Sequence, residues 1–492
     1  MKKYIFIFFL FSVAAILYLS FPINSKEHFV SIKENKFKLN GKDFYPVVVN
    51  YLATLRYDGK ELWAGPATSY DADTLHNLLT KGSCLKGLRA DLNLIKQMGF
   101  NAVRICGIGE EGADDNDRLS KISMMARYGR NQDTTVFLSS DEMYKKYFDA
   151  LSGLFNEVNN AGLKSIFLVR TRPGVVTTED HVKKTVTRFR NDTSIMAYDL
   201  YNEPLYFDHK ERKKSEVNSI VKGWHKMFKM YAPNHLFTIG LEGIREVFEW
   251  DPNMLDMDFI SLHPYEFEPG QVMNELYWYG NYITKPWIIG ETAIPADNDS
   301  VTYEEQKQFA NKTLKQAYNC GASGYSWWQY KDVDWHTYRA NYMGVVTRTG
   351  EIKINKDNLQ VQGTVKPVAE AFKKFIPFGK KDSCICLSNY YNYSEGKASR
   401  IIGHLIDEET EQPIKGGVVL GWDEHWVHSY HTVTKDDGSF EVLGVHPFYH
   451  WIATATMYEA VRDDFGPNSS KPGKDNIPTF DLGTLKVKKA DL

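Results

Sequence analysis

Lysine and arginine are not concentrated anywhere along the 492 residues of this sequence, and the formal net charge is only −3. Proteins that bind nucleic acids usually carry a basic patch or stripe that contacts the phosphates. We therefore expect no nucleic-acid partner.

Cysteine is also scarce, and the five residues are Cys84, Cys106, Cys320, Cys384 and Cys386. Only Cys384 and Cys386 are close neighbours, and no second pair lies at the spacing of a zinc site. The pattern does not indicate a disulfide framework, and an odd number leaves at least one thiol free or paired with another chain. We expect no metal and no cofactor.

Aromatic residues, in contrast, make up 14% of the chain, with 11 Trp and 29 Tyr. Most such rings fill a core, but amphipathic rings also stack on partly apolar ligands such as sugars. The length suits one large and one small domain, because a (β/α)₈ barrel commonly uses about 250 residues or more.

The N-terminus has the pattern of an export signal, in which Lys2 and Lys3 precede an apolar run over residues 4–21. This run also reaches the lower length limit of a membrane-spanning helix, so a retained anchor is the alternative to cleavage near Ser25. No cysteine precedes Cys84, which excludes a lipid attached at the cleavage site. We expect residues 1–25 to be a signal peptide or an anchor, and the protein to be periplasmic, extracellular or anchored facing outward.

Eight strand-like segments follow, and helical segments separate most of them. The predicted strands are 44–52, 101–105, 164–170, 195–203, 236–241, 258–265, 286–291 and 322–330. Ser139 with Glu142 and Thr302 with Glu305 form capping-box patterns at the start of two of the helices. No two-residue hairpin joins the strands, which favours parallel pairing with crossover helices.

Eight strands of this kind predict an α/β fold, a (β/α)₈ TIM barrel over residues 30–377. An open, doubly wound sheet is the alternative, but no Gly-x-Gly-x-x-Gly loop follows the first strand. Residues 378–397 have the composition of a linker. Short strand-like runs at 401–406, 417–421, 429–434, 439–442 and 450–457 then predict a small antiparallel β-sandwich over residues 398–492.

The predicted strands end on polar and aromatic side chains, and in a TIM barrel the active site forms at the carboxyl ends of the strands. Each of these residues alone has a structural explanation, such as an ion pair for Arg104, a core histidine for His263 or core packing for Trp328. Their placement at one mouth is harder to explain by packing. The strand-end residues are Arg104, Asn202, Glu203, His263, Tyr265, Glu291, Trp327, Trp328 and Gln329.

Five motifs together resemble glycoside hydrolase family 5, or a close relative among the clan A retaining glycosidases such as cellulases and mannanases. They are Met98-Gly-Phe-Asn-Ala-Val-Arg104-Ile, Asp199-Leu-Tyr-Asn-Glu203-Pro, Ser261-Leu-His263-Pro-Tyr265, Lys285-Pro-Trp-Ile-Ile-Gly-Glu291 and Gly324-Tyr-Ser-Trp-Trp328-Gln. The resemblance covers residues 36–376 and implies retaining hydrolysis of β-glycosides in a poly- or oligosaccharide.

The resemblance also implies roles for these residues, with Glu203 as the acid/base and Glu291 as the nucleophile. Glu203 has to hold a proton at rest, and we expect repulsion from an ionised Glu291 to raise its pKa. Arg104 and Tyr265 would keep Glu291 ionised. The residues implied to bind substrate are Arg104, Asn202, His263, Tyr265 and Trp328.

The end of the third strand departs from the family pattern. Many glucan-cleaving members have a histidine there, whereas this chain reads Leu168-Val-Arg170-Thr-Arg172. An ordinary cellulase is therefore in doubt. A metal-dependent barrel hydrolase would be expected to show His-x-His or clustered ligands at strand ends, and the sequence has none.

The C-terminal region resembles the carboxypeptidase regulatory-like domain, a transthyretin-like sandwich. The resemblance rests on Gly403-His-Leu-Ile-Asp407, Gln412-Pro413-Ile414 and Thr434-Lys-Asp-Asp-Gly438-Ser-Phe440. It implies a spacer or docking unit without chemistry of its own. The alternative function for the whole chain is a carbohydrate-binding protein with a silent barrel, or one that binds through the sandwich aromatics Trp422, Trp426, Tyr430 and Trp451.

Overall fold

The computed structural model describes residues 28–67, 80–108, 110–112, 122–127, 133–208, 210–266, 268–334, 341–354, 356–386, 398–466, 470–473 and 475–491. The predicted signal or anchor segment lies outside these residues, as does most of the predicted linker. Among the helices within them, none combines the length and the apolar character needed to cross a bilayer.

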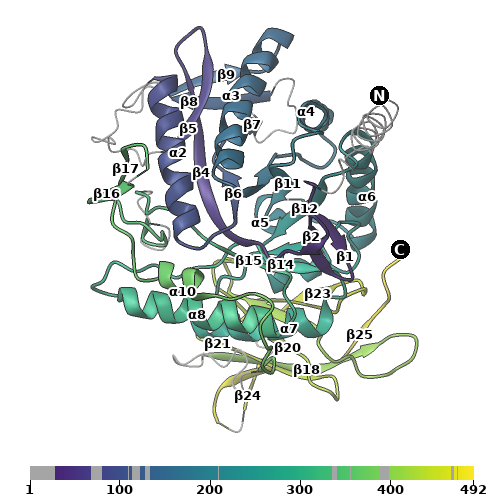
Figure 1. Ribbon diagram of the computed structural model, residues 1–492. Helices are drawn as coiled ribbons and strands as arrows, with labels where there is room; N and C mark the ends of the chain where they lie inside the picture. The colour runs from purple at the N-terminus through teal and green to yellow at the C-terminus, as the bar shows by residue number, and fades with distance from the viewer. Residues whose placement is uncertain are drawn as a thin grey trace, which may run out of the picture.

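Eight parallel strands form a closed ring (Figure 1). The last strand pairs with the first, which confirms the TIM barrel and is incompatible with an open, doubly wound sheet. The strands are almost entirely buried, as expected where helices cover the outside of a parallel sheet. In order around the ring they are β4 (Val47–Tyr57), β6 (Ala102–Cys106), β10 (Lys164–Leu168), β11 (Ile195–Asn202), β12 (Leu236–Leu241), β13 (Ile260–Leu262), β14 (Trp287–Ile289) and β15 (Gly324–Trp327).

The barrel helices agree with the sequence pattern at most positions. The capping box of Thr302 and Glu305 is present at the start of α8. The prediction for α3 is wrong by one residue, because the side chain of Ser140, not Ser139, accepts from the backbone N–H of Met143. The helices that cover the barrel include α2 (Lys81–Gln97), α3 (Asp141–Asn160), α4 (Val176–Arg188), α6 (Lys214–Tyr231), α7 (Val272–Tyr282), α8 (Tyr303–Asn319) and α10 (Ala369–Lys374).

Two segments that follow predicted strands form further ordered elements. The first strand continues to Tyr57 and pairs in a hairpin with β5 (Leu62–Pro66). The aromatic segment after the sixth strand contains helix α7, whose buried face includes Leu276, Trp278 and Tyr279. Between β12 and β13 the chain forms only a short 3-10 helix, η2 (Ile244–Phe248).

The C-terminal region consists of two four-stranded sheets, as predicted for a sandwich. One sheet is mixed rather than antiparallel, because β18 pairs in parallel with β25. Tyr430 and Trp451 are buried in the sandwich core, whereas Trp426 is exposed and stacks on His450. In sheet order the strands are β21 (Ser439–Gly444), β18 (Ser399–Asp407), β25 (Pro478–Val487) and β24 (Lys471–Pro472), then β20 (Ser429–Val433), β19 (Val418–Trp422), β22 (His450–Thr454) and β23 (Val461–Asp464).

The central strands of the second of these sheets, β19 and β22, are buried on both faces. Along β19, Val419 faces the sandwich core, while Val418 and Leu420 belong to the hydrophobic core of the barrel. The same alternation places Ala453 of β22 in the sandwich core and Ile452 in the barrel core. The sandwich lies beneath helices α7 and α8 in Figure 1. The expectation of a spacer is therefore wrong in one respect, since the two regions share a continuous apolar core.

A disulfide also joins the end of the barrel to the segment that follows it. Cys320, the residue after α8, is bonded to Cys384. The sequence analysis did not predict this pair. Of the remaining cysteines, Cys84 and Cys106 are buried thiols and Cys386 is an exposed one.

Candidate active site

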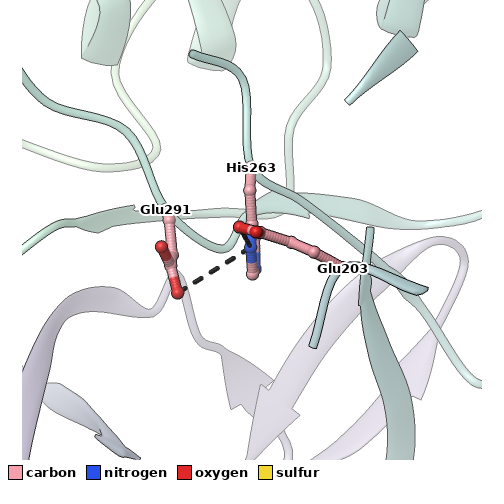
Figure 2. Close-up of side chains that lie close together, drawn as sticks. All are labelled: Glu203, His263 and Glu291. Carbon is pink, nitrogen blue, oxygen red and sulfur yellow. Dashed lines mark hydrogen bonds and ion pairs between the residues drawn. The ribbon is translucent and has the colours of Figure 1, made fainter. Parts of the chain in front are cut away.

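Two carboxylates and one imidazole meet at the carboxyl ends of the barrel strands. Glu203 follows β11, Glu291 follows β14 and His263 follows β13. One ligand atom from each lies within 4.8 Å of the other two. Figure 2 shows the carboxylates approaching from opposite sides, with the imidazole between them. The structure thus brings together Glu203 and Glu291, the two carboxyls at predicted strand ends.

The backbone at Glu203 does not have the conformation that a following proline favours. A residue before proline is biased toward extended conformations, but Glu203 has a φ of 48° and lies in the left-handed region. Pro204 begins the short helix α5 (Pro204–Phe207), and the N–H of Glu203 donates to the carbonyl of Gly240 at 2.6 Å. Non-glycine residues held in this region store strain and cluster at functional sites.

Arg104 is the central cation of the site and is almost fully buried at 1% exposure. Its Nη1 donates to Glu291 Oε1 at 2.5 Å and to Asn50 Oδ1 at 2.9 Å. Its Nε donates to Asp199 Oδ2 at 2.9 Å, and its Nη2 donates to Asn202 Oδ1 at 2.8 Å. A planar guanidinium offers five N–H donors in fixed directions, whereas an ammonium offers three on a flexible stem. Arg104 therefore fixes both Glu291 and Asn202 relative to the barrel.

His263 fits only because two neighbouring positions are glycine. Its Nδ1 lies 2.9 Å from Glu203 Oε1 and 3.7 Å from Glu291 Oε1. A Cβ at Gly240 would come within 2.6 Å of its ring, and a Cβ at Gly290 within 2.7 Å. Burial lowers the pKa of His263 to about 4, so the imidazole is neutral near pH 7. A neutral ring can donate one hydrogen bond to Glu203 without adding charge.

The other predicted residues lie at the same mouth. Tyr265 donates from its hydroxyl to Glu291 Oε2 at 3.2 Å. Trp328 is half-buried after β15, and its peptide bond to Gln329 is cis. Arg170, which stands where a histidine was expected, is exposed at the end of β10. Trp327 and Gln329 are buried, and the indole N–H of Trp327 donates to the carbonyl of Met343, which is a structural contact.

Burial controls the titration of both carboxyls. It raises the pKa of Glu203, and the charge of Asp199 adds to this effect while Arg104 opposes it. Our expectation that repulsion from Glu291 would be the cause is therefore wrong, because burial is the main one. Burial also raises the pKa of Glu291, and repulsion from the charge of Glu203 adds to this, while Arg104 opposes it through charge and a direct hydrogen bond. His263 would oppose it only when protonated, so near pH 7 the groups that favour the ionised form of Glu291 are the guanidinium of Arg104 and the hydroxyl of Tyr265.

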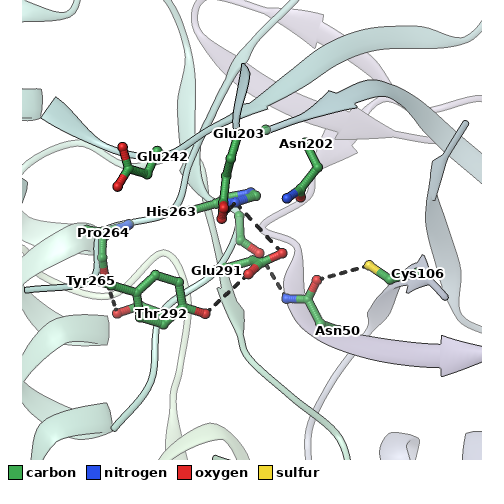
Figure 3. A network of polar contacts seen from close by, with 12 residues as sticks. Asn50, Cys106, Asn202, Glu203, Glu242, His263, Pro264, Tyr265, Glu291 and Thr292 are labelled. Atoms are coloured by element: carbon green, nitrogen blue, oxygen red, sulfur yellow. Dashed lines mark hydrogen bonds and ion pairs between the residues drawn. The ribbon is translucent and has the colours of Figure 1, made fainter. Parts of the chain in front are cut away.

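Four further residues of the site were missed at the sequence level. Asn50 on β4 donates to the carbonyl of Gly290 and accepts from Arg104. Asp199 on β11 is fully buried and holds Arg104 from the other side. Cys106 lies against Arg104 and Asn50, and Glu242 lies away from them beside Glu203 and Pro264 (Figure 3). A polar residue inside an apolar strand is the signal that could have identified Asn50 and Asp199.

Among the described residues, two clusters of three side chains have ligand atoms close enough together to hold a metal ion. One is the triad of Glu203, His263 and Glu291, in which Arg104 already pairs with Glu291. The other consists of Glu266, Glu275 and His431, where the barrel meets the sandwich. In the triad of Glu203, His263 and Glu291, the guanidinium of Arg104 therefore already supplies a positive charge beside the carboxylates.

Comparisons with known proteins identify similar backbones but no related sequence. No protein-family model matches the chain, and no curated protein matches it in sequence. Among solved structures, a GH5_18 protein from Streptomyces cattleya in complex with Manβ1-4GlcNAc is 14% identical, with 74% of this chain and 85% of that chain covered and a TM-score of 0.48.

Two further matches are similarly distant. The endo-1,4-β-mannanase of Rhizomucor miehei is 14% identical over 70% of this chain and 100% of its own, with a TM-score of 0.44. The β-glucuronidase of Bacteroides uniformis is 14% identical over 91% of this chain, with a TM-score of 0.43. This chain covers only 47% of that glucuronidase. The fold assignment rests on the closed ring of strands, and the function on the geometry of the site.

Proposed function

We propose that the protein is an exported, retaining β-glycoside hydrolase that cleaves O-glycosidic bonds in a poly- or oligosaccharide by double displacement. The observation that carries this proposal is the facing pair of Glu203 and Glu291, whose nearest oxygens lie within 4.8 Å. Retaining glycosidases hold their two carboxyls about 5 to 5.5 Å apart, whereas inverting enzymes separate them by about 6.5 to 9.5 Å to admit a water. This separation favours retention.

The surroundings of the two carboxyls support different roles for them. Arg104 and Tyr265 both donate to Glu291, which favours its ionised form and makes it the nucleophile. Glu203 has no direct bond from Arg104, and burial raises its pKa. A carboxyl that keeps its proton near neutral pH is suited to be the general acid.

In the first step, a carboxylate oxygen of Glu291 attacks the anomeric carbon while Glu203 donates its proton to the leaving oxygen. The glycosidic bond breaks and a glycosyl ester forms on Glu291. In the second step, ionised Glu203 takes a proton from a water molecule whose oxygen attacks the same carbon. The ester bond breaks, the sugar leaves with its original configuration, and Glu203 is protonated again.

The remaining residues have supporting roles. The amide oxygen of Asn202 accepts from Arg104, which leaves its NH₂ group to donate to a sugar hydroxyl. Such a bond to the 2-hydroxyl strengthens in the transition state. We propose that Trp328 packs under the reacting sugar and that His263 orients Glu203. Export rests on the N-terminal segment, and the carboxypeptidase regulatory-like identity of the sandwich rests on its three motifs.

The alternative, a carbohydrate-binding protein with a silent barrel, is less well supported. A silent barrel would have no need for a buried arginine bonded to a strand-end carboxylate. Arg104, Tyr265 and both carboxyls are all present in hydrogen-bonding geometry. A buried charge array of this kind is costly to keep without a use.

The proposal is tested with Glu291→Ala and an external nucleophile. On aryl β-glycosides, this variant should lose activity by about a thousandfold or more, as for other essential catalytic groups. Azide should restore turnover and give the α-glycosyl azide, because it attacks from the face that Glu291 has vacated. Near-normal hydrolysis by Glu291→Ala would show that the nucleophile is another residue. Glu203→Ala should instead give the β-glycosyl azide and lose least on substrates with good leaving groups.

A further inference from the structure

The sandwich reaches the loop that carries Tyr265. His431 lies on β20, and its Nε2 is 3.4 Å from Oε1 of Glu266, the residue that follows Tyr265, a close polar contact that is longer than a usual hydrogen bond. The side chains of His431 and Glu266 are only 5% and 7% exposed. Tyr265 and Glu266 are consecutive and contact different parts of the molecule. Tyr265 is hydrogen-bonded to Glu291, and Glu266 is buried against the sandwich.

Glu266 is also held from the barrel side. It is hydrogen-bonded to Glu275 of α7, and one ligand atom each of Glu266, Glu275 and His431 lies within 4.8 Å of the others. Glu275 in turn accepts from the backbone N–H of Ile244 and from the hydroxyl of Tyr279. Glu266 is therefore the point where α7, the loop after β13 and the sandwich meet.

This contact lies between uncharged groups near neutral pH. Burial raises the pKa of Glu266 well above its usual range, and a shared hydrogen bond with Glu275 adds to this. Burial lowers the pKa of His431 well below its usual range, with Arg245 adding to the effect. The contact is therefore a buried polar contact, and salt in solution should have little effect on it.

A second polar contact of β20, made by a charged side chain, supports the loop after β12. Arg245 of η2 donates to Ser429 Oγ of β20 at 3.2 Å and pairs with Glu242, which lies beside the site. Strand β20 thus contacts both loops that follow β12 and β13. The same sheet contributes Val418, Leu420 and Ile452 to the barrel core, which fixes its position under these loops.

We propose that the sandwich is part of the catalytic unit, and that His431 is a positioning residue that holds Glu266 and thereby orients Tyr265 toward Glu291. This inference rests on the proposed function, in which Tyr265 stabilises the nucleophile. Tyr265 has a single hydrogen bond to Glu291, at 3.2 Å, near the long end of the usual range. A small shift of its loop would break that bond.

The test is a double-mutant cycle in the full chain between His431→Ala and Tyr265→Phe. If His431 acts through the tyrosine, His431→Ala should lower kcat about tenfold in the parent enzyme with little change in KM. In the Tyr265→Phe background the same change should lower kcat less than about twofold. His431→Gln, which keeps a polar side chain that can fill the same space, should recover most of the loss. A general loss of folded protein would reduce kcat equally in both backgrounds, and such additivity would overturn the proposal.

The matched control is His450→Ala in the same sheet. The Nδ1 of His450 lies 2.6 Å from Asp464 Oδ1 and its ring stacks on Trp426, both within the sandwich. This variant should leave kcat unchanged.

Amide hydrogen exchange gives a readout that does not need activity. Exchange over residues 260–266 should increase in His431→Ala and not in His450→Ala. If exchange increases in His431→Ala but the parent protein hydrolyses no glycoside, the positioning role stands and the proposed function is refuted. If the parent protein is active but exchange in His431→Ala is unchanged, only the positioning role is refuted.

Discussion

The guanidinium of Arg104 determines the chemistry of this site at the scale of single residues. It bonds Glu291, Asn50, Asp199 and Asn202 from a position that is 1% exposed. Asp199 balances its charge in the interior, so the guanidinium is a fixed and largely desolvated donor. Preorganised donors of this kind stabilise charge with little reorganisation during the reaction.

Arg104→Lys should lower kcat/KM about 100-fold or more, the range seen when one preorganised electrostatic contact is lost. Lysine keeps the charge but cannot reach four acceptors in fixed directions. Steady-state kinetics on an aryl β-glycoside measures the loss. The control is Arg89→Lys, because Arg89 makes a two-pronged contact with Glu157 between α2 and α3, away from the site. Equal activity of both variants would contradict the role of Arg104.

At the scale of elements, the sequence predicts the barrel well and the connections poorly. All eight strands occur in the predicted order, because each is an apolar run bounded by polar or turn residues. Helix α7 is not among the predicted elements, because its aromatic residues hide the helical period. The strand β25 was missed because Pro478, Asp481 and Gly483 interrupt its alternation. Its pairing with β18 is irregular at Ile402 and His404, which is a tertiary feature.

The candidate site likewise has features that the sequence predicts and features that it does not. The strand ends identify Glu203, Glu291, His263 and Tyr265, because parallel strands of a barrel end at one face. The left-handed backbone of Glu203 depends on the contact with Gly240 on the next strand, and no local pattern encodes it. The continuously apolar β19 is a signal of burial on both faces, and it could have predicted the contact between sandwich and barrel.

Lys214 at the start of α6 forms a buried ion pair within the barrel and joins the barrel to the sandwich by hydrogen bonds. Its Nζ donates to Asp251 at 2.9 Å and to two groups of the sandwich, the hydroxyl of Thr454 and the carbonyl of Ala455. Lys214 is 1% exposed and Asp251 is fully buried.

Lys214→Ala should lower the free energy of unfolding by about 3 to 5 kcal/mol, because Asp251 would be left buried without its cation. Thermal or urea unfolding measures the change. The adjacent and exposed Lys213 is the matched control, since Lys213→Ala should alter stability by no more than about 0.5 kcal/mol. If the two variants unfold alike, Lys214 does not hold the sandwich to the barrel.

At the scale of the whole molecule, buried carboxyls and buried histidines make stability depend on pH in opposite directions. Burial raises the pKa of Glu249 to about 7, that of Asp332 to about 6 and that of Glu246 well above its usual range. Such groups stabilise the fold below the unfolded pKa near 4.5, and this is lost as pH rises through the folded pKa. Burial lowers the pKa of His235 and His263 to about 4, so their contribution is present above about 6.5 and is lost as pH falls toward 4.

Stability should therefore decline as pH is raised from about 7.5 to about 8.5, where the histidines are neutral in both the folded and the unfolded state. Each carboxyl still protonated in the fold contributes about 1.4 kcal/mol per pH unit to this slope. Differential scanning fluorimetry across this range should show a falling midpoint. Glu246→Gln should flatten the slope, because the fully buried Glu246 is then no longer titratable. Glu304→Gln on the exposed face of α8 should keep the original slope, and a steeper slope for Glu246→Gln would contradict the account.

The central claim, double displacement by Glu203 and Glu291, is tested most directly by the configuration of the first product. Proton NMR of the parent enzyme acting on a β-glycoside, recorded within the first minutes, resolves the two anomers before they equilibrate. The account predicts that the β-anomer appears first and the α-anomer grows in later by mutarotation. An α-anomer formed first would show inversion and contradict the assignment of Glu291 as the nucleophile.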